Sequence, residues 1–461
     1  MALAKIAGQP SHGVDPRRID TLMAREVDQF RREHRTSAEL HEKTKDFFVH
    51  GVPLHWMSQW PGPNPVFVER ASGTSLVDVD GNTYVDFCLG DSGAFFGHAN
   101  PQVSAAIAEY VQRNGSTMML PTEDALYVGE ELSRRFGLPV WQYATSATDA
   151  NRFAIRIARM VTGRDKILVF NGKYHGSVDE TQVELEDGEM VPQHGIHPNA
   201  TRFGETTVCI EFNDVSALEA ALSAGDIACI LAEPVMTNIG MVPVDDGFHE
   251  SMRDLSRKYG TLIVIDETHT ICFGPGGYTA THGLEPDFLV VGKVLAGGIP
   301  SAVYGMSKAI ANQLEVLTGA PGINHYGFGG TLTGNALTVR AMRATLEHVA
   351  TDKNFERVFH LAEQLRVGID NQIRTSRLPW HVLRFGARVE YLFRPAPARN
   401  GSEAAAARDD FIESYIHLHA LNRGVLLTPF HNMALVSPAT SGADVERYLE
   451  VFAACLDELA A

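Results

Sequence analysis

The chain has 461 residues and a formal net charge of −17, with 44% hydrophobic and 21% charged residues. This length exceeds what one small core supports, so we expect two domains, or one large α/β domain with additions. The negative charge weighs against nucleic acid or an anionic membrane surface as a partner.

Neither a disulfide framework nor a metal site is indicated by the sequence. The five cysteines lie far apart and form no Cys-x-x-Cys pair, which is typical of buried thiols in a reducing compartment. Residues 1–10 lack the apolar stretch of a signal peptide, and no apolar run approaches the about 18 residues of a spanning helix. We therefore expect a cytoplasmic protein.

The first part of the chain changes pattern twice. Residues 16–48 are charge-rich with helical spacing, which we interpret as a plain surface helix. Residues 66–87 contain two turns and predict a short antiparallel meander. A helix over 102–112 follows.

The middle of the chain, about 120–345, alternates helical patterns with short apolar runs. Such continuous runs are typical of strands covered on both faces, and alternation of strand and helix favours a mostly parallel sheet. A helix with an apolar stripe covers 150–161 and is followed by Gly163. The predicted strands are 166–170, 227–232, 262–265, 288–291 and 302–304.

The last part, from about 350, mixes helix and short strands and ends in an amphipathic helix near 445–459. It predicts a smaller α+β domain. We expect an N-terminal helix and the first part of the small domain in 1–115, a large domain in 116–345, and the rest of the small domain in 346–461.

Polar side chains follow several predicted strands directly. Because ligands bind beyond the carboxyl ends of the strands in open α/β sheets, these side chains are expected to face one crevice. They include two carboxylates, a lysine and a Tyr-His pair: Asp266 after 262–265, Lys293 after 288–291, Glu233 after 227–232, and Tyr174 with His175 after 166–170.

This combination suits pyridoxal phosphate (PLP). A buried lysine forms a Schiff base with an aldehyde cofactor, and Asp266 could pair with the pyridinium nitrogen. Backbone N–H groups near Ser146, Ala147 and Thr148, just before the striped helix, could hold the phosphate, and Tyr174 could stack on the ring. Each residue alone is more often a surface charge, a helix cap or a core aromatic. Their coincidence at strand ends favours the cofactor site.

The chain resembles the class III (fold type I) aminotransferases over nearly its whole length from about Pro65. It is most similar to glutamate-1-semialdehyde aminomutase and its aminotransferase relatives. The resemblance is carried by residues 77–87, Gly97-His98-Ala99-Asn100-Pro101, 144–150, Tyr174-His175-Gly176, Glu233-Pro234-Val235, Ile265-Asp266-Glu267, Gly292-Lys293 and 330–335.

The resemblance implies a large domain with a mostly parallel seven-stranded sheet, plus a smaller α+β domain from both chain ends. It implies that Lys293 carries the cofactor and moves the substrate proton, and that Thr331 reaches the phosphate of a neighbouring subunit. A homodimer or dimer of dimers with shared sites is therefore expected. The residues expected at the cofactor are Ser146, Ala147, Thr148, Tyr174, His175, Glu233, Asp266, Thr268, His269, Lys293 and Thr331.

Several positions depart from the family pattern. Ala147 replaces the usual glycine, while Thr268 and His269 stand where valine and methionine are common. The aminomutase's arginine is absent from residues 55–60, and its acidic residue is absent from 428–432.

Without that arginine a substrate carboxylate loses its bidentate partner. The tryptophans in residues 55–60 offer contact area to an apolar group instead, so a hydrophobic amine is favoured over a carboxylate-bearing substrate. We therefore predict transfer of an amino group from a hydrophobic primary amine to a keto acid such as pyruvate. Trp56 and Trp60 are candidates for the amine pocket, and Arg388 or Arg394 for the carboxylate of the keto acid.

Other functions stay open at this point. Within PLP enzymes, the alternatives are an aminotransferase or epimerase of β- or D-amino acids, and an aminomutase-like enzyme. A PLP-fold regulatory module is disfavoured by the presence of Lys293 and the absence of a basic helix-turn-helix stretch. A dinucleotide-dependent dehydrogenase is disfavoured because no Gly-x-Gly-x-x-Gly follows the first strand.

Overall fold

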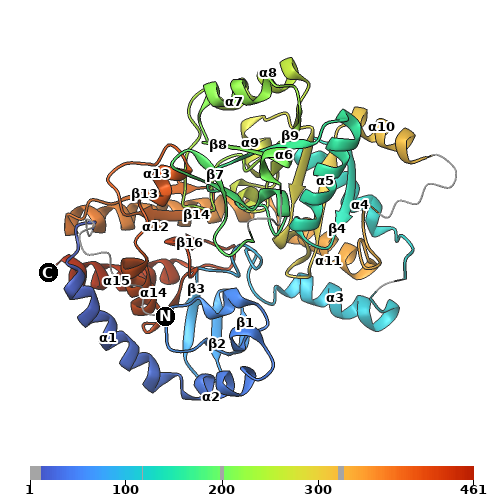
Figure 1. Cartoon of the computed structure of the whole chain (residues 1–461). Helices are drawn as coiled ribbons and strands as arrows, with labels where there is room; N and C mark the ends of the chain where they lie inside the picture. Colours follow the sequence, from blue (N-terminus) through green and yellow to red (C-terminus); the bar gives the residue numbers. More distant parts are fainter. Residues whose placement is uncertain (1–11, 117, 198–201, 320–326, 461) are drawn as a thin grey trace.

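A seven-stranded sheet forms the centre of the protein (Figure 1). This computed structural model describes residues 12–116, 118–197, 202–319 and 327–460, so the expectation about a signal peptide in 1–10 concerns residues outside the described ones. The sheet order is β4-β12-β11-β10-β9-β5-β8. Its strands are β4 Val140–Ala144, β5 Lys166–Phe170, β8 Thr207–Ile210, β9 Ile227–Ala232, β10 Leu262–Asp266, β11 Phe288–Val291 and β12 Ala302–Met306.

The sheet is mostly parallel, as predicted. Strands β11, β10, β9, β5 and β8 run parallel to their neighbours, and only β12 is antiparallel to both β11 and β4. All five predicted strands are present. Strands β4 and β8 were not among them, because edge strands such as β4 are partly exposed and carry polar residues, here Gln142.

Helices cover both faces of this sheet. Successive residues of a strand point to opposite faces, so Val169 packs with α5 while Leu168 and Phe170 pack with α7 and α8. This explains why all six residues of β9 are buried. The helices of this part are α3 Pro101–Asn114, α4 Asp124–Phe136, α5 Ala147–Thr162, α6 Phe203–Thr206, α7 Val215–Leu222, α8 Phe248–Tyr259, α9 Gly277–His282, α10 Lys308–Thr318 and α11 Ala336–His348.

The two ends of the chain meet in one sheet. The predicted meander is β1 Val68–Ser72, β2 Ser75–Asp78 and β3 Thr83–Asp86, and β3 pairs in parallel with β15 Val425–Leu426. Such pairing is what a small domain built from both chain ends requires. The domain boundaries at 115/116 and 345/346 stay predictions. A hairpin of β6 Val183–Glu186 and β7 Glu189–Pro192 lies apart from these sheets.

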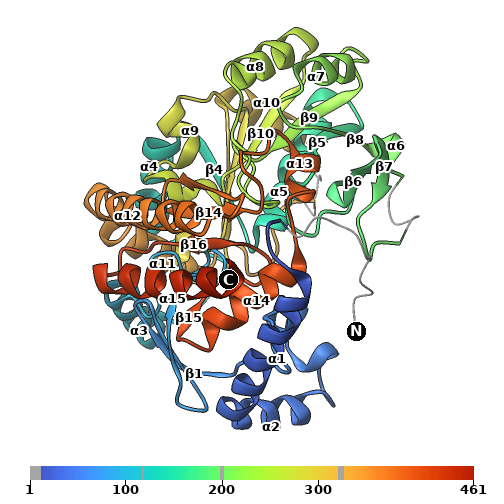
Figure 2. The same ribbon diagram turned by 90° about the vertical axis from the view of Figure 1, so that its left-hand side faces the viewer.

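A second small sheet packs beside the first in the C-terminal part. It has the order β13-β14-β16, from β13 His381–Phe385, β14 Arg388–Leu392 and β16 Met433–Leu435. Figure 2 shows one helix of this part, α14 Asp410–Leu421, beside the N-terminal helix α1 Pro16–Glu33. The helices of this C-terminal part are α12 Asp352–Ser376, α13 Gly401–Ala405, α14 and α15 Gly442–Ala460. Among the described residues, no helix is both long and apolar enough to cross a membrane.

The prediction of one plain surface helix over 16–48 is wrong in two respects. The segment forms two helices, α1 Pro16–Glu33 and α2 Arg35–Thr44, which are separated at the non-helical residue His34. Helix α1 buries Ile19, Glu26 and Phe30 against α14 and the meander. The sequence did not indicate this packing, because Ile19 and Phe30, the two apolar residues that α1 buries, lie among many charged residues.

Glu26 ties α1 to the C-terminal helices. Its carboxylate accepts hydrogen bonds from Asn422, Arg423 and Arg25 at 2.6–3.2 Å. Burial by itself raises the pKa of this carboxyl, but the hydrogen bonds from Arg423, Asn422 and Arg25 outweigh it and lower the pKa to about 2.

We expect Glu26→Gln to destabilise the protein by about 2 kcal/mol at pH 7, because it removes charge-assisted hydrogen bonds from a buried site. The folded-state pKa lies below the ordinary value of 4.5, so the stabilisation is present above pH 4.5 and is lost as the pH falls towards 2. Urea unfolding of both proteins across this range measures the effect. The matched control is Asp28→Asn on the exposed face of α1, for which we expect a change below about 0.5 kcal/mol. A difference that stays constant from pH 7 to pH 3 would contradict this account.

Candidate active site

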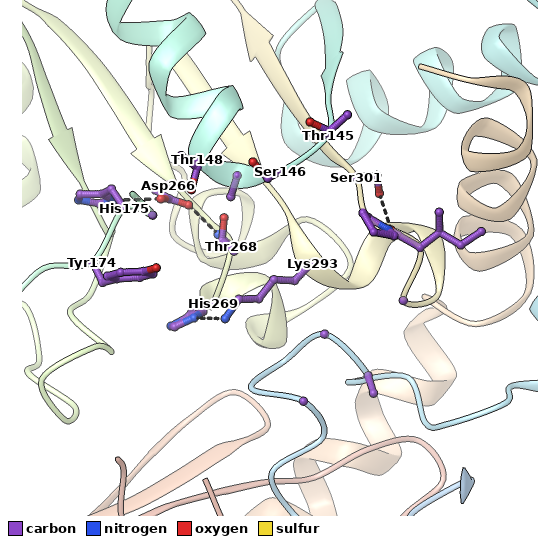
Figure 3. A pocket seen from close by; sticks show the side chains of 18 of the residues that line it. Thr145, Ser146, Thr148, Tyr174, His175, Asp266, Thr268, His269, Lys293 and Ser301 are labelled. Atoms are coloured by element: carbon purple, nitrogen blue, oxygen red, sulfur yellow. Dashed lines mark hydrogen bonds and ion pairs between the residues drawn. The ribbon is translucent and has the colours of Figure 1, made fainter. Parts of the chain in front are cut away.

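A cavity of about 460 Å³ lies beyond the carboxyl ends of the central strands. This volume is within the usual range for small-ligand sites. Ten of the eleven residues predicted at the cofactor line it (Figure 3). They are Ser146, Ala147, Thr148, Tyr174, His175, Glu233, Asp266, Thr268, His269 and Lys293.

Lys293 follows β11 directly and is held from several sides. Its backbone lies in the left-handed region, with φ of 58°, a strained conformation that surrounding structure must maintain. Its Nζ donates to Asp91 Oδ2 at 2.6 Å and to the Asp91 carbonyl at 2.7 Å, and lies 2.5 Å from His269 Nε2. The amine is therefore aimed into the cavity and fixed in place (Figure 3).

Asp91 is a site residue that the sequence analysis missed. It lies in the turn after β3, at φ of 48°, and so reaches Lys293 from the sheet formed by the chain ends. Burial raises its pKa, but the positive charge of Lys293 and the contact with His269 outweigh burial and hold the pKa well below the usual value. A signal was present: an acidic residue between Gly90 and Gly93 places a charge in a turn just before the Gly97-His98 motif.

Asp266, at the end of β10, is an ionised carboxylate inside the protein. Its Oδ2 accepts from His175 Nδ1 at 2.9 Å and from Asn151 Nδ2 at 2.8 Å, and its Oδ1 accepts from the Thr268 backbone N–H at 3.0 Å. Burial raises its pKa, but these hydrogen bonds, led by His175, lower it to about 2. A buried, ionised carboxylate of this kind suits a protonated ring nitrogen.

The N-terminus of α5 supplies an anion site at the cavity wall. Ser146 is the N-cap, and its hydroxyl accepts from the Asp149 N–H at 3.2 Å. The N–H groups of Ala147 and Thr148 are in the first turn, where no intrahelical acceptor exists. A Cβ at Gly292 would lie 2.8 Å from the Ala147 Cβ, so this glycine keeps the turn open.

Two aromatic residues, Trp56 and Tyr174, line one side of the cavity, and Phe430 packs against Trp56. Tyr174 lies 5.6 Å from Trp56 between ring centroids, and Trp56 lies 5.8 Å from Phe430. Trp56 belongs to the short 3₁₀ helix η2, His55–Ser58. This wall offers apolar contact area to a flat ring or an apolar substituent.

The other predicted residues lie away from the cavity wall. The Trp60 indole donates to the Leu427 carbonyl at 2.9 Å and packs in a separate core. Arg394 pairs with Glu403 at 3.0 Å. Thr331 is exposed near the start of α11.

Arg388 is wholly buried behind the cavity. Its Nη2 lies 3.9 Å from Asp91 Oδ1, and among the residues that the structure describes neither Nη1 nor Nη2 has a hydrogen-bond partner. A buried guanidinium whose Nη atoms lack hydrogen-bond acceptors is costly, and Asp91 is the anion that opposes its charge.

The residues present fit pyridoxal phosphate. An ionised carboxylate, a fixed lysine, a helix N-terminus and a flat aromatic side chain surround one cavity. Two polar atoms beside Asp266, His175 Nε2 and Thr268 Oγ1, are buried without a partner. When bound, this cofactor supplies an electron sink for negative charge developing on the substrate carbon.

The fold and the cavity define a PLP-dependent enzyme of fold type I. The family model for class III aminotransferases (Aminotransferase class-III) matches residues 56–456. The chain therefore belongs to the class III aminotransferases, whose cofactor is pyridoxal phosphate.

Among known proteins, several aminomutases are similar to this chain. A glutamate-1-semialdehyde 2,1-aminomutase of Sorangium cellulosum is 34% identical over 408 residues, covering 87% of this chain and 90% of its own. A crystal structure of a glutamate-1-semialdehyde-aminomutase from Pseudomonas aeruginosa PAO1 is 56% identical, with a TM-score of 0.95, covering 97% of this chain and 100% of its own. A second crystal structure, of a lysine-to-alanine variant of a glutamate-1-semialdehyde-aminomutase from Pseudomonas aeruginosa PAO1, is in complex with PMP.

A transaminase is similar at a greater distance. An omega-transaminase from Sphaerobacter thermophilus is 26% identical, with a TM-score of 0.84, covering 92% of this chain and 98% of its own.

We expect borohydride reduction of the holoenzyme to attach the cofactor to Lys293 alone. Lys173 provides an internal control, because burial lowers its pKa to about 8 and makes it chemically competent. Its Nζ, however, donates to the Val183 carbonyl and lies outside the cavity. Peptide mapping by mass spectrometry locates the label. Label on Lys173, or persistence of the visible cofactor band in Lys293→Met, would contradict the assignment.

Proposed function

We propose that this enzyme moves an amino group between neighbouring carbons of a small substrate that also bears a carboxylate, as the names of its 2,1-aminomutase relatives state for those proteins. One observation carries the proposal. The buried Arg388 guanidinium, with two unpaired nitrogens, lies 3.9 Å from Asp91 Oδ1, and Asp91 Oδ2 lies 2.6 Å from Lys293 Nζ. A cation and an anion therefore stand beside the reacting lysine.

These two charges match a substrate with both kinds of group. Arg388 can bind a carboxylate through two parallel N–H donors, and Asp91 can hold an ammonium group. A substrate with a carboxylate and an amine beside a carbonyl satisfies both. The absence of an arginine in residues 55–60 counted against such a substrate in the sequence, but Arg388 supplies a cation from β14 instead.

Each chain residue then has a defined task. Lys293 Nζ removes and returns the proton at the substrate carbon, and Asp266 holds the ring nitrogen in its protonated state. Ser146, Ala147 and Thr148 bind the phosphate, Tyr174 packs on the ring face, and Thr268 and Glu233 border it. We also propose that Thr331 completes the phosphate site of a neighbouring subunit in a homodimer.

Transamination of a hydrophobic amine with a keto acid acceptor is the second candidate. The aromatic wall of Trp56, Tyr174 and Phe430 favours it, because such a wall gives an apolar substituent contact area. In this case Arg388 would bind only the keto acid.

The two candidates are separated by substrate. We expect the purified enzyme to convert glutamate-1-semialdehyde into its isomer with the amino group on carbon 1, without added keto acid, as followed by NMR. In parallel, 1-phenylethylamine and pyruvate are supplied and alanine is measured. Turnover of the semialdehyde alone supports the first candidate, whereas alanine formation without semialdehyde turnover replaces it with the second.

We expect Arg388→Met to lower kcat/KM for the carboxylate-bearing substrate about 30-fold or more, corresponding to a loss of about 2 kcal/mol. Bleaching of the cofactor band by 1-phenylethylamine should change little, because this amine has no carboxylate. Arg394→Met, which removes an arginine already paired with Glu403, serves as the matched control and should behave as wild type. An equal loss with both ligands, in a variant that retains the cofactor band, would refute the role of Arg388.

A further inference from the structure

A chain of hydrogen bonds leads from Lys293 to Glu233 through two intervening side chains. Lys293 Nζ lies 2.5 Å from His269 Nε2, and His269 Nδ1 lies 3.2 Å from Thr237 Oγ1. Thr237 Oγ1 lies 2.5 Å from Glu233 Oε2. Figure 3 shows the contact of His269 with Lys293.

The direction of these hydrogen bonds follows from one fixed donor. The Thr237 backbone N–H donates to Glu233 Oε2 at 2.9 Å, so this oxygen is an acceptor. The Thr237 hydroxyl then gives its own hydrogen to the same oxygen and has only lone pairs left for His269. With Glu233 ionised, His269 Nδ1 carries a proton and donates to Thr237 Oγ1, and Nε2 turns a lone pair towards Lys293.

The surroundings keep this imidazole neutral. His269 is 9% exposed, and burial, followed by the positive charges of Lys293 and Arg388, lowers its pKa to about 4, against the opposing effect of Asp91. The charged or titratable groups that face it are Lys293 after β11, Arg388 on β14, Asp91 after β3, and Glu233 through Thr237. At neutral pH, Nε2 is an acceptor opposite a cationic donor.

We propose that His269 is a proton acceptor for Lys293, and that Thr237 and Glu233 are positioning residues that set its tautomer. Lysine attacks an aldehyde only as a neutral amine. In this step an N–H bond of the Nζ ammonium breaks and an N–H bond forms at His269 Nε2. The resulting imidazolium keeps its Nδ1–H bond to Thr237 and gains Asp91 Oδ2 at 3.5 Å as counter-ion.

The inference concerns how Lys293 becomes reactive and is independent of the substrate. An apolar side chain at position 269, such as the methionine common in relatives, could not accept the proton. Thr237 orients His269 in the way that hydrogen-bonding partners orient metal-bound histidines. At such metal sites, loss of the orienting partner typically lowers metal affinity or activity 10–100-fold.

The tautomer can be observed directly in the apoprotein. With ¹⁵N-labelled histidine and His269→Gln for assignment, NMR should show His269 protonated at Nδ1 and unprotonated at Nε2 at pH 7.5. Thr237→Val, which replaces the hydroxyl with a methyl group of similar size, should increase the Nε2-protonated form. Protonation of wild-type His269 mainly at Nε2 would overturn the proposal.

The kinetic test follows capture of pyridoxal phosphate by the apoenzyme through growth of the visible band. We expect Thr237→Val to slow capture about 10-fold or more and Thr237→Ser to restore it, because serine keeps the hydroxyl. Thr338→Val is the matched control, since Thr338 is buried in α11 with no partner for its Oγ1. Equal capture rates for Thr237→Val and Thr338→Val, or failure of Thr237→Ser to restore the rate, would overturn the proposal even where the aminomutase reaction is confirmed.

Discussion

The ion pair between Lys293 and Asp91 is the contact on which the active site depends. Lys293 lies just beyond β11, a central strand of the large sheet, whereas Asp91 lies in a turn after β3, a strand of the sheet made from the two chain ends. Both residues have positive φ values, so neither backbone conformation is intrinsically favoured. The two sheets must dock correctly to maintain this pair, which links the packing of the chain ends to the position of the reactive amine.

Charges of opposite sign alternate across the cavity. The ionised Asp266 lies beyond β10, the N-terminus of α5 favours an anion at the cavity wall, and Asp91 lies between Lys293 and the buried Arg388. Because the site is buried, each charge acts with little solvent screening. A cofactor with a cationic ring and an anionic phosphate can therefore bind in one orientation only.

His269 places an imidazole nitrogen 2.5 Å from the lysine amine. The position was noted in the sequence as a departure, but its partners are distant along the chain. Glu233 and Thr237 both follow β9, which ends at Ala232, whereas His269 follows β10. Parallel pairing of β9 and β10 brings these residues together, and only the folded chain shows that they form a continuous hydrogen-bonded path to the amine.

The sequence by itself determined the parallel sheet and most of the cofactor cavity. Strands covered on both faces leave continuous apolar runs, and the polar residues that follow such runs must gather at one edge. It did not determine the docking of α1, the pairing of Asp91 with Lys293 or the position of the Arg388 side chain. These depend on contacts between segments hundreds of residues apart, such as β3 with β15, and on side chains whose burial has no local signature. Trp60 and Arg394 illustrate the same limit: nearby motifs suggested the cavity, but tertiary packing directed both side chains elsewhere.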